Sequence, residues 1–518
     1  MEEMAGQFSA ELLALVPDWK QRLLADPSHL PSLEQEVHTA FARGADLLSA
    51  GLMALVMKQP EFAAASEQTR SGYRSAAGGL ARGRERTIRV RLLGGLVLWV
   101  TSLYCAPRRP LGRRPEEEVS GLYVELAQFG CGKGVTPALE SRVARQAALC
   151  PSLESAQQEL ERNGLKLDVK TVGRITYQCG ESLLGLRKYQ LLAWREGKLP
   201  AGTELHGKRV TVQIDGGRTR IRGPLRPALP QPEPTDAEGF VLQNAPGRSK
   251  KRPTQTYDAD WREPKLVTIF VHDEQGRMVK RSRATLEGTF LGPDALAELV
   301  AMHLHRLGAA GAQSITFVSD GAPWIWDRVK QIVSLAKLDH VKIHEVLDVC
   351  HAAHHISLAL ATQGLNTTDR MPLYREHRTL LRNGQWRRVV EELTDLAENE
   401  PGNEKMRTEI AYLRKHGEAG RLSYPHYRAL GLPLGSGAVE SSIRRVINLR
   451  LKGNGMFWRE RQAEAMLQVR AQVISNRWDD RLGEMRDLSR RQARTNWRWE
   501  PQAMSVKSEC APTLPRAP

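Results

Sequence analysis

Cysteine is scarce in this chain and is not arranged in pairs. The six cysteines among the 518 residues are Cys105, Cys131, Cys150, Cys179, Cys350 and Cys510. No two of them form a Cys-x-x-Cys motif, so the spacing argues against a disulfide framework and against a zinc ribbon. Such cysteine usage is expected of a protein in a reducing cytoplasm.

Long hydrophobic runs are also missing. The longest apolar run lies near residues 47–57, well short of the roughly 20 residues that span a bilayer as a helix. The first residues, MEEMAGQ, are acidic at their start and do not have the basic beginning of a secretory signal. The sequence therefore predicts neither a membrane-spanning nor a targeting segment.

Acidic residues are outnumbered by basic ones. The chain has 59 Asp and Glu against 75 Lys and Arg, a net charge of +16 and a pI near 9.7. A basic balance favours a polyanionic partner such as nucleic acid over an acidic metabolite. The length exceeds the size at which one hydrophobic core stops growing, so about two to four domains are expected.

The first 130 residues divide into a helical region and a β-hairpin. Leucines and alanines recur at helical spacing within residues 1–86. Residues 87–105 are rich in β-branched and apolar residues on both sides of Gly94-Gly95, which predicts a β-hairpin. A linker rich in proline and arginine follows, so the hairpin and linker together occupy residues 87–130.

Residues 131–200 carry the signals of three short helices. Thr136 and Asp168 cap the first and the third, and the second follows Pro151-Ser152. The outward positions of the third helix are Lys170, Thr171, Arg174 and Gln178. A helix-turn-helix presents polar and basic residues to the major groove in this way. We expect a helix-turn-helix DNA-binding domain, with a three-helix domain that makes no DNA contact as the alternative.

From residue 205 the pattern changes to a period of two. Val210, Val212 and Ile214 alternate with polar residues and end at Asp215, which predicts a strand. Further strands are expected at residues 266–273, 278–286, 314–320 and 343–348, with a helix at 294–307. This order predicts a mixed α/β core over residues 205–360, interrupted by a flexible loop at 223–254.

The remainder of the chain is expected to be helical. Residues 361–433 show helical spacing without a strand signal and predict an all-α insertion. Residues 434–495 predict two basic amphipathic helices broken at Gly453-Asn454-Gly455. The last segment, 496–518, has the composition of a disordered tail.

Three acidic residues occupy positions from which they can meet. Asp215 and Asp320 end two of the predicted strands, and Glu440 lies early on a predicted helix. If the three carboxylates meet at one edge of the sheet, they remain ionised together only when hard cations neutralise them, and Mg²⁺ prefers such oxygen ligands. Two Mg²⁺ ions would suit phosphodiester chemistry. Asx turns for the aspartates and a helix N-terminus for the glutamate are the alternatives.

Five segments of the chain resemble one family in their order. They are VQIDGGRTRIR, WREPKLVTIFVHDEQGR, FVSDGAPWIW, LDVCHAAHHI and GSGAVESSIRRVINLRLKGNGMFW. Together they resemble bacterial insertion-sequence DDE transposases of the ISKra type, relatives of the Mutator-like group. The resemblance covers about residues 209–473. It implies an RNase H-like (retroviral-integrase-like) core with an α-helical insertion, and a DDE triad of Asp215, Asp320 and Glu440.

A histidine joins this group by the same resemblance. Asp348-Val349-Cys350-His351 matches the Asp-x-x-His signature of relatives, which implies that His351 approaches the scissile phosphate as a donor or an imidazolium. A zinc site is the alternative. Its ligands would come from His344, Cys350, His351, His354 and His355.

Basic and aromatic residues gather around the expected site. The candidate phosphate contacts are Arg218, Arg220, Arg444, Arg445, Arg450, Lys452 and Arg459. The candidates for stacking on unpaired bases are Trp324, Trp326 and Trp458. A solvated basic face and tryptophans packed in the core are the alternatives.

The sequence as a whole leads to the hypothesis of a DNA transposase. The chain would bind terminal inverted repeats of double-stranded DNA, cleave a phosphodiester with two Mg²⁺ ions, for which Mn²⁺ substitutes, and transfer the 3′-hydroxyl to target DNA. The resemblance implies a dimer or larger homo-oligomer at the bacterial nucleoid. A catalytically silent DNA-binding regulator and a nuclease that only cuts are the alternatives.

Overall fold

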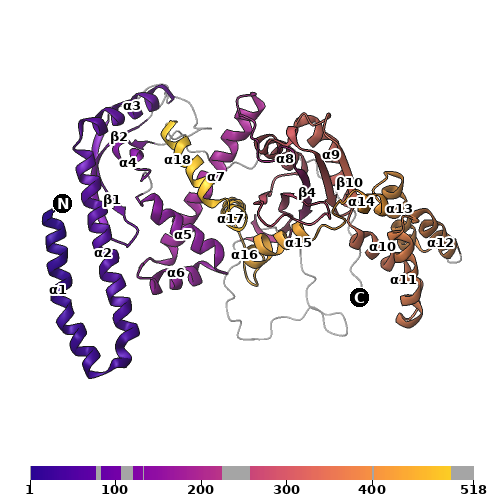
Figure 1. Ribbon diagram of the computed structural model, residues 1–518, viewed down its shortest axis with the longest axis horizontal. Coiled ribbons are helices and arrows are strands. Elements are labelled where there is room, and N and C mark those ends of the chain that lie inside the picture. Colours follow the sequence, from indigo (N-terminus) through magenta and orange to yellow (C-terminus); the bar gives the residue numbers. More distant parts are fainter. Residues whose placement is uncertain are drawn as a thin grey trace, which may run out of the picture.

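The computed structural model describes residues 2–76, 83–106, 121–131, 134–224, 257–398 and 402–491 of this mixed α/β protein. Figure 1 shows the N-terminal helices at one end of the molecule and the helices of residues 349–429 at the other, with the main sheet between them. The predicted tail, most of the predicted linker and the predicted loop from residue 225 onward lie outside the described residues.

A five-stranded sheet forms the centre of the larger half. Its strands are β4 (Arg209–Gly216), β7 (Lys265–Val271), β8 (Thr285–Thr289), β9 (Ser314–Ser319) and β10 (Ile343–Leu347). They lie in the order β10-β9-β4-β7-β8. β4, β7 and β8 pair antiparallel, whereas β9 and β10 run parallel to β4. The central strand of the sheet is therefore β4, the first of the five in the sequence.

Four of these strands lie where the sequence predicts them, but the strand expected at residues 278–286 is wrong in position. Asp273 accepts the amides of Gln275 and Arg277 and closes one turn. A second turn follows, because the Ser282 amide donates to the carbonyl of Val279. Met278 and Val279 still bond to the end of β7, but regular pairing resumes only at β8, since local turn bonds compete with strand pairing in this segment.

The two faces of the sheet are covered by different helices. On one face Val210, Val212 and Ile214 pack with helices α8 (Pro293–Leu307) and α9 (Pro323–Leu335). The opposite face, with Gln213, meets α15 (Gly437–Ser442), the π-helical segment Ile443–Asn448 and α17 (Glu460–Ile474). Because side chains alternate along a strand, Asp215 shares this second face with Gln213.

The remaining elements of this half surround the sheet. A short hairpin, β5 (Thr219–Gly223) and β6 (Asp258–Arg262), extends the β4–β7 pair. The helical insertion consists of α10 (Val349–Ala361), α11 (Thr367–Arg382), α12 (Trp386–Glu398), α13 (Glu404–Glu418) and α14 (Tyr424–Ala429). The short helix η2 (Ala309–Gly311) follows α8. The last described elements are α16 (Leu449–Leu451), α17 and α18 (Trp478–Arg491).

The N-terminal half begins with helices and a small sheet. Its elements are α1 (Glu2–Ala25), η1 (Pro27–His29), α2 (Leu30–Met57), α3 (Pro60–Ala76), β1 (Arg84–Arg91), β2 (Val97–Cys105), β3 (Leu122–Tyr123) and α4 (Val124–Gln128). The predicted hairpin is confirmed, with its turn at Gly94-Gly95. The buried Asp46 carboxylate of α2 accepts the amides of Gly94 and Leu96 at 2.9 Å each, which fastens that turn to the helix.

One apolar helical stretch goes beyond the sequence-based expectation. In the part of the chain that the structure describes, only Pro27–Met57 is long and apolar enough to cross a membrane by length and composition. Asp46 lies within this stretch, and its carboxylate accepts the amide of Gly94 in the hairpin turn. Core helices and signal sequences share this length and composition, so the stretch by itself is weak evidence for a membrane location.

Three helices follow the small sheet, with the predicted caps at their starts. They are α5 (Pro137–Leu149), α6 (Leu153–Arg162) and α7 (Val169–Arg195). The side chains of Thr136, Ser152 and Asp168 each accept an amide of the first turn. α7 is much longer than the short third helix expected, and its second half packs on α17 and α18. Figure 1 shows α18 next to α7.

Gly180 explains how closely α7 approaches α17. A Cβ atom at Gly180 would lie 2.6 Å from the carbonyl oxygen of Ala465. We therefore expect Gly180→Ala to lower the free energy of unfolding by about 1–3 kcal/mol through overpacking. Gly483 in α18 has no atom within 4 Å of such a Cβ, so Gly483→Ala should raise stability by about 0.5–1 kcal/mol. Chemical unfolding of both variants tests this; equal effects would contradict it.

Candidate active site

The register of the sheet brings Asp215 and Asp320 side by side. β4 and β9 are paired in parallel along four residues, and the same register, continued to the carboxyl ends, sets these two aspartates opposite each other. Backbone pairing stops before them, because the Ile214 amide donates to the Ser319 hydroxyl at 3.1 Å. The two strands part at this edge, which is where open α/β sheets bind ligands.

Both aspartates lie in an environment that disfavours their charge. Burial and the nearby Asp320 carboxylate raise the pKa of Asp215 to about 6, with a smaller increase from Glu440. Burial also raises the pKa of Asp320. His351 lies close enough to oppose the rise in both. Burial, more than the neighbouring charges, therefore disfavours ionisation of both aspartates.

Each aspartate also holds its own backbone. The Gly216 amide donates to Oδ1 of Asp215 at 2.6 Å, and the Ala322 amide donates to Oδ1 of Asp320 at 3.1 Å. The second contact is the Asx turn considered as an alternative for Asp320. It uses one carboxylate oxygen, so the turn and a ligand-binding role are compatible.

Glu440 reaches the same face because Gln213 holds its helix. The Gln213 side chain donates to the carbonyl of Gly435 at 2.8 Å and accepts the amide of Val439 at 3.0 Å. Gln213 is almost fully buried and precedes Asp215 by two residues on β4. One strand therefore both carries the first aspartate and positions the helix that carries the glutamate.

The carboxylate of Glu440 is directed at His351 and Ser436. Its Oε1 lies 3.4 Å from Nε2 of His351 and 2.9 Å from the Ser436 hydroxyl, and about half of the side chain (51 %) is exposed. The same histidine lowers the pKa of both aspartates, so it interacts with all three acids.

Asp348 joins the two helices that carry His351 and Glu440. Its Oδ1 caps α10 by accepting the amides of Cys350 at 2.6 Å and His351 at 2.9 Å. Its Oδ2 accepts the Ser436 amide and lies 2.8 Å from the Ser436 hydroxyl. That hydroxyl has one hydrogen and two carboxylate neighbours, so it donates to one of them at a time. Asp348 itself is buried.

The donor set fits a hard divalent cation, although no closed cage is present. Among the described residues no group of three His, Cys, Asp or Glu side chains is arranged to hold a metal ion. Asp215 and Asp320 nevertheless offer carboxylate oxygens, the ligand type that Mg²⁺ prefers, and burial is the main cause that raises the pKa of both. Glu440 would complete the set by turning away from His351.

The zinc interpretation finds no support in the same region. Its candidate ligands separate in the structure: His355 Nδ1 pairs with Glu409, and His351 pairs with Glu440. His344 lies on β10, ahead of the α10 cap, where burial lowers its pKa. These histidines therefore serve different contacts.

The predicted DNA contacts divide into surface and interior residues. The exposed ones are Lys170, Arg174, Arg218, Arg444, Arg445, Lys452 and Arg459; Thr171, Gln178, Arg220 and Trp324 are half-buried. Arg450 and Trp458 must be removed from the set. Arg450 is buried and donates to the carbonyl of Ala147, and Trp458 is buried and donates to that of Leu451. Trp326 is also buried and donates to the carbonyl of Asp320.

Sequence reasoning missed the residues that position the site. Gln213 and Ser436 are the clearest cases, and Asp348 was seen only as part of a signature. A glutamine inside an otherwise apolar or small-residue strand is the one local signal that could have pointed to a buried hydrogen-bonding role. The partners of all three lie far away in the sequence, in segments whose packing no local pattern reveals.

Asp348→Asn tests the double role of this side chain. An asparagine caps a helix about as well as an aspartate, but it presents one acceptor where Asp348 presents two. We expect stability to fall by about 1–3 kcal/mol, because the buried Ser436 amide loses its acceptor. The matched control is Asp168→Asn at the exposed cap of α7, which should be nearly neutral. Equal unfolding midpoints of the two variants would show that Asp348 does not connect α10 to the segment that carries Glu440.

Comparison of the chain with protein-family models, with curated proteins and with solved structures found no match.

Proposed function

We propose that this chain is a DNA transposase that cuts and joins DNA at a DDE site formed by Asp215, Asp320 and Glu440. The observation that carries the proposal is the juxtaposition of the two aspartates by the β4–β9 register, with the glutamate helix bound to the same strand through Gln213. A five-stranded sheet with three antiparallel and two parallel strands, centred on its first strand, also supports an RNase H-like core.

Asp215, Asp320 and Glu440 would hold Mg²⁺, or Mn²⁺ in its place. When bound, a pair of such ions supplies activation of the attacking oxygen and stabilisation of the leaving oxygen. The chain itself supplies the remaining features. The β4–β9 pairing ends before Asp215 and Asp320, and His351 lies 3.4 Å from Glu440 and lowers the pKa of both aspartates.

His351 would hold a proton next to the reacting phosphate. Its Nε2 lies 3.4 Å from Oε1 of Glu440, where a protonated imidazole would pair with the carboxylate. In that form it can donate a hydrogen bond to a phosphate oxygen, and in its neutral form it can accept a proton from water. The cap at Asp348 fixes the helix that carries it.

Basic residues on separate elements would contact the DNA substrate. Arg444, Arg445 and Lys452 are exposed shortly after Glu440, and Arg218 follows Asp215. α5 to α7 would act as a helix-turn-helix, with Lys170 and Arg174 exposed on the first turns of α7. Because two DNA ends must be processed together, we also propose a homo-oligomer that acts at the bacterial nucleoid.

Strand joining separates this proposal from its alternatives. The purified protein is incubated with Mg²⁺ and DNA that carries its coding region with both flanks, and in parallel with pre-cut ends that have a free 3′-hydroxyl. We expect cleavage at inverted repeats and joined products. Cleavage without joining would indicate a nuclease, and binding without either would indicate a regulator; both results contradict the proposal.

A further inference from the structure

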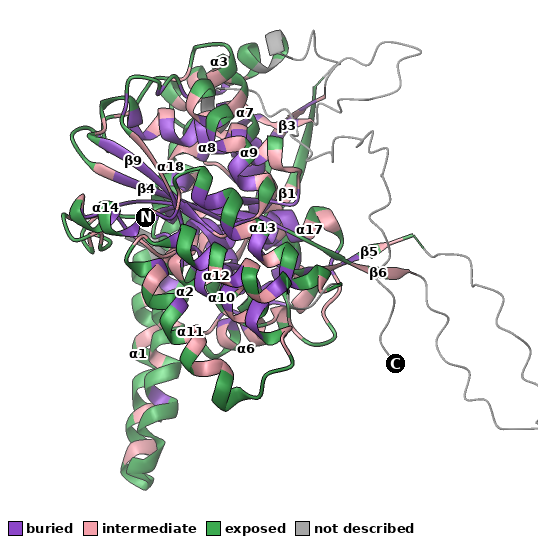
Figure 2. Ribbon diagram, turned by 90° about the vertical axis from the view of Figure 1, so that its right-hand side faces the viewer, coloured by how far each residue is buried: buried purple, intermediate pink, exposed green. Residues whose placement is uncertain are grey.

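The β5–β6 hairpin leaves the main sheet at the edge that carries the acidic residues. Gly216, at the end of β4, pairs with Lys265, and the Gly217 amide donates to the carbonyl of Pro264 at 2.8 Å. The hairpin then continues as the pair Thr219↔Arg262. Figure 2 shows β5 and β6 projecting from the body of the molecule. We call this hairpin, over the described residues of β5 and β6, the arm.

The two faces of the arm differ in chemistry. Ile221 faces inward, is 5 % exposed and packs in the cluster that contains Trp458. Arg220 and Arg222 alternate onto the outer face, where Arg220 lies directly across from Trp261. Side-chain alternation sends Asp258 and Asp260 to the face of Ile221. The outer face therefore carries cations and an aromatic ring without an acid of β6.

Aromatic rings and guanidinium groups interleave on this outer face. The Arg220 guanidinium lies 4.8 Å from the ring centroid of Trp261 and 5.6 Å from that of Phe457. The Arg222 guanidinium lies 4.5 Å from the ring of Tyr257. The rings of Tyr257 and Phe457 are 5.9 Å apart. Trp261, at 49 % exposure, is the open end of this series.

The backbone next to the arm holds these side chains in place. The Trp458 amide donates to the carbonyl of Arg220 at 3.0 Å, and the Arg222 amide donates to the carbonyl of Trp458 at 2.8 Å. Nε of Arg222 donates to the carbonyl of Phe457 at 3.1 Å. The cluster is therefore ordered before any partner binds, which reduces the entropy lost on binding.

We propose that this face of the arm binds an unpaired nucleotide of the DNA substrate. A half-exposed tryptophan offers a flat surface on which any base can stack, and arginines beside it suit the phosphates that flank that base. The arm begins at the acidic edge, so a nucleotide held there belongs to the strand that the site processes. The inference rests on the proposed DNA substrate, but binding of the nucleotide requires no cleavage.

Equilibrium binding to two matched DNAs tests this inference. One is a blunt duplex and the other is the same duplex with a short unpaired tail that contains 2-aminopurine. We expect the wild type to prefer the tailed DNA and to quench the 2-aminopurine fluorescence. Trp261→Ala should weaken binding of the tailed DNA at least about fivefold, the lower end of a stacking contribution, and should abolish the quenching. Trp261→Phe should retain most of both.

Trp99 provides a matched control. It is 64 % exposed on β2 and also lies near a guanidinium, that of Arg89 at 5.7 Å, so Trp99→Ala should bind both DNAs like the wild type. Equal loss on blunt and tailed DNA for Trp261→Ala, or no loss on either, would overturn the inference. Strand joining with the same preparations separates the two proposals: tail binding that depends on Trp261 without any joining would reject only the proposed transposase.

Discussion

Replacing Asp320 by asparagine is expected to abolish DNA cleavage and joining while DNA binding persists. The substitution keeps the shape and the turn acceptor at Ala322 but removes the charge that a divalent cation requires. We expect the rate of DNA cleavage to fall by a factor on the order of 10² or more, because the reacting groups lose their positions when the cation is not held. Asp215→Asn and Glu440→Gln should behave alike. Cleavage of labelled DNA ends by each variant measures this, and unchanged cleavage would remove these residues from the active site.

The same substitution of Asp215 should stabilise the metal-free protein. Its folded-state pKa, raised to about 6, lies above the unfolded value, so the ionised carboxylate opposes folding. The contribution of Asp215 to stability is fully present below its unfolded-state pKa of about 4 and is lost as the pH rises through 6. In chelator at pH 8, Asp215→Asn should therefore raise the free energy of unfolding by about 2 kcal/mol, after an allowance for partial exposure.

Asp273→Asn is the matched control for this effect. The Asp273 carboxylate accepts the amides of an exposed turn, and these hydrogen bonds lower its pKa. Removal of its charge should leave stability unchanged or reduce it, opposite in sign to Asp215→Asn. At pH 4 the stabilisation by Asp215→Asn should shrink. If Asp215→Asn destabilises the protein in chelator at both pH values, burial and neighbouring carboxylates do not disfavour the charge of Asp215 as described.

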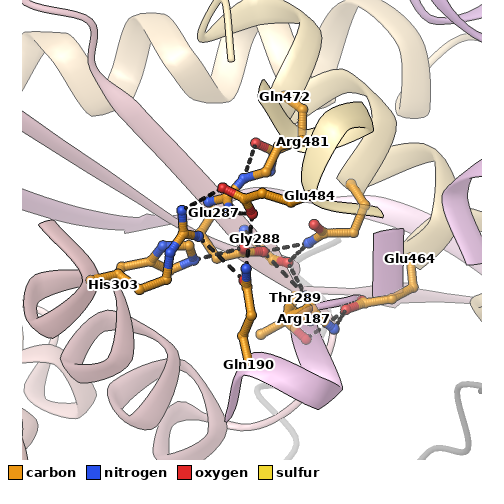
Figure 3. A network of polar contacts seen from close by, with 12 residues as sticks. Arg187, Gln190, Glu287, Gly288, Thr289, His303, Glu464, Gln472, Arg481 and Glu484 are labelled. Carbon is orange, nitrogen blue, oxygen red and sulfur yellow. Dashed lines mark hydrogen bonds and ion pairs between the residues drawn. The ribbon is translucent and has the colours of Figure 1, made fainter. Parts of the chain in front are cut away.

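The second large effect is expected at the buried ion pair between Arg187 and Glu464. Nη2 of Arg187 lies 2.6 Å from Oε1 of Glu464, and Nη1 lies 3.2 Å from Glu287. Glu464 also accepts the Thr289 hydroxyl at 2.8 Å and the Phe290 amide at 2.7 Å. Figure 3 shows how these side chains point toward one another from α7, α17 and β8. The contacts join the helix-turn-helix candidate to the sheet.

Glu464→Ala should lower the free energy of unfolding by about 3–5 kcal/mol, because it leaves a buried guanidinium with one carboxylate fewer. Glu464→Gln keeps an acceptor and should cost less. The control is Arg162→Met at the exposed pair with Glu159 on α6, where about 0–1 kcal/mol is expected. Denaturant unfolding measures all three variants. A Glu464→Ala variant as stable as the control would show that the network does not hold the two halves together.

Local patterns predicted most elements and their ends. The alternation at residues 209–215 marks β4, and the caps at Thr136 and Asp168 start α5 and α7. These features depend on neighbouring residues, since side-chain periodicity and capping act within one turn or one strand. The strand at residues 278–286 was misplaced because two consecutive turns occupy the segment before β8.

What the sequence by itself determined is therefore the elements, the positions of the acids at strand ends and the basic character of the surface. Only the tertiary structure decided that Gln213 and Asp348 hold the glutamate helix, that Arg450 and Trp458 are interior, and that Arg187 pairs with a residue 277 positions away. Burial and polar pairing depend on partners that packing brings together, and no local periodicity encodes them.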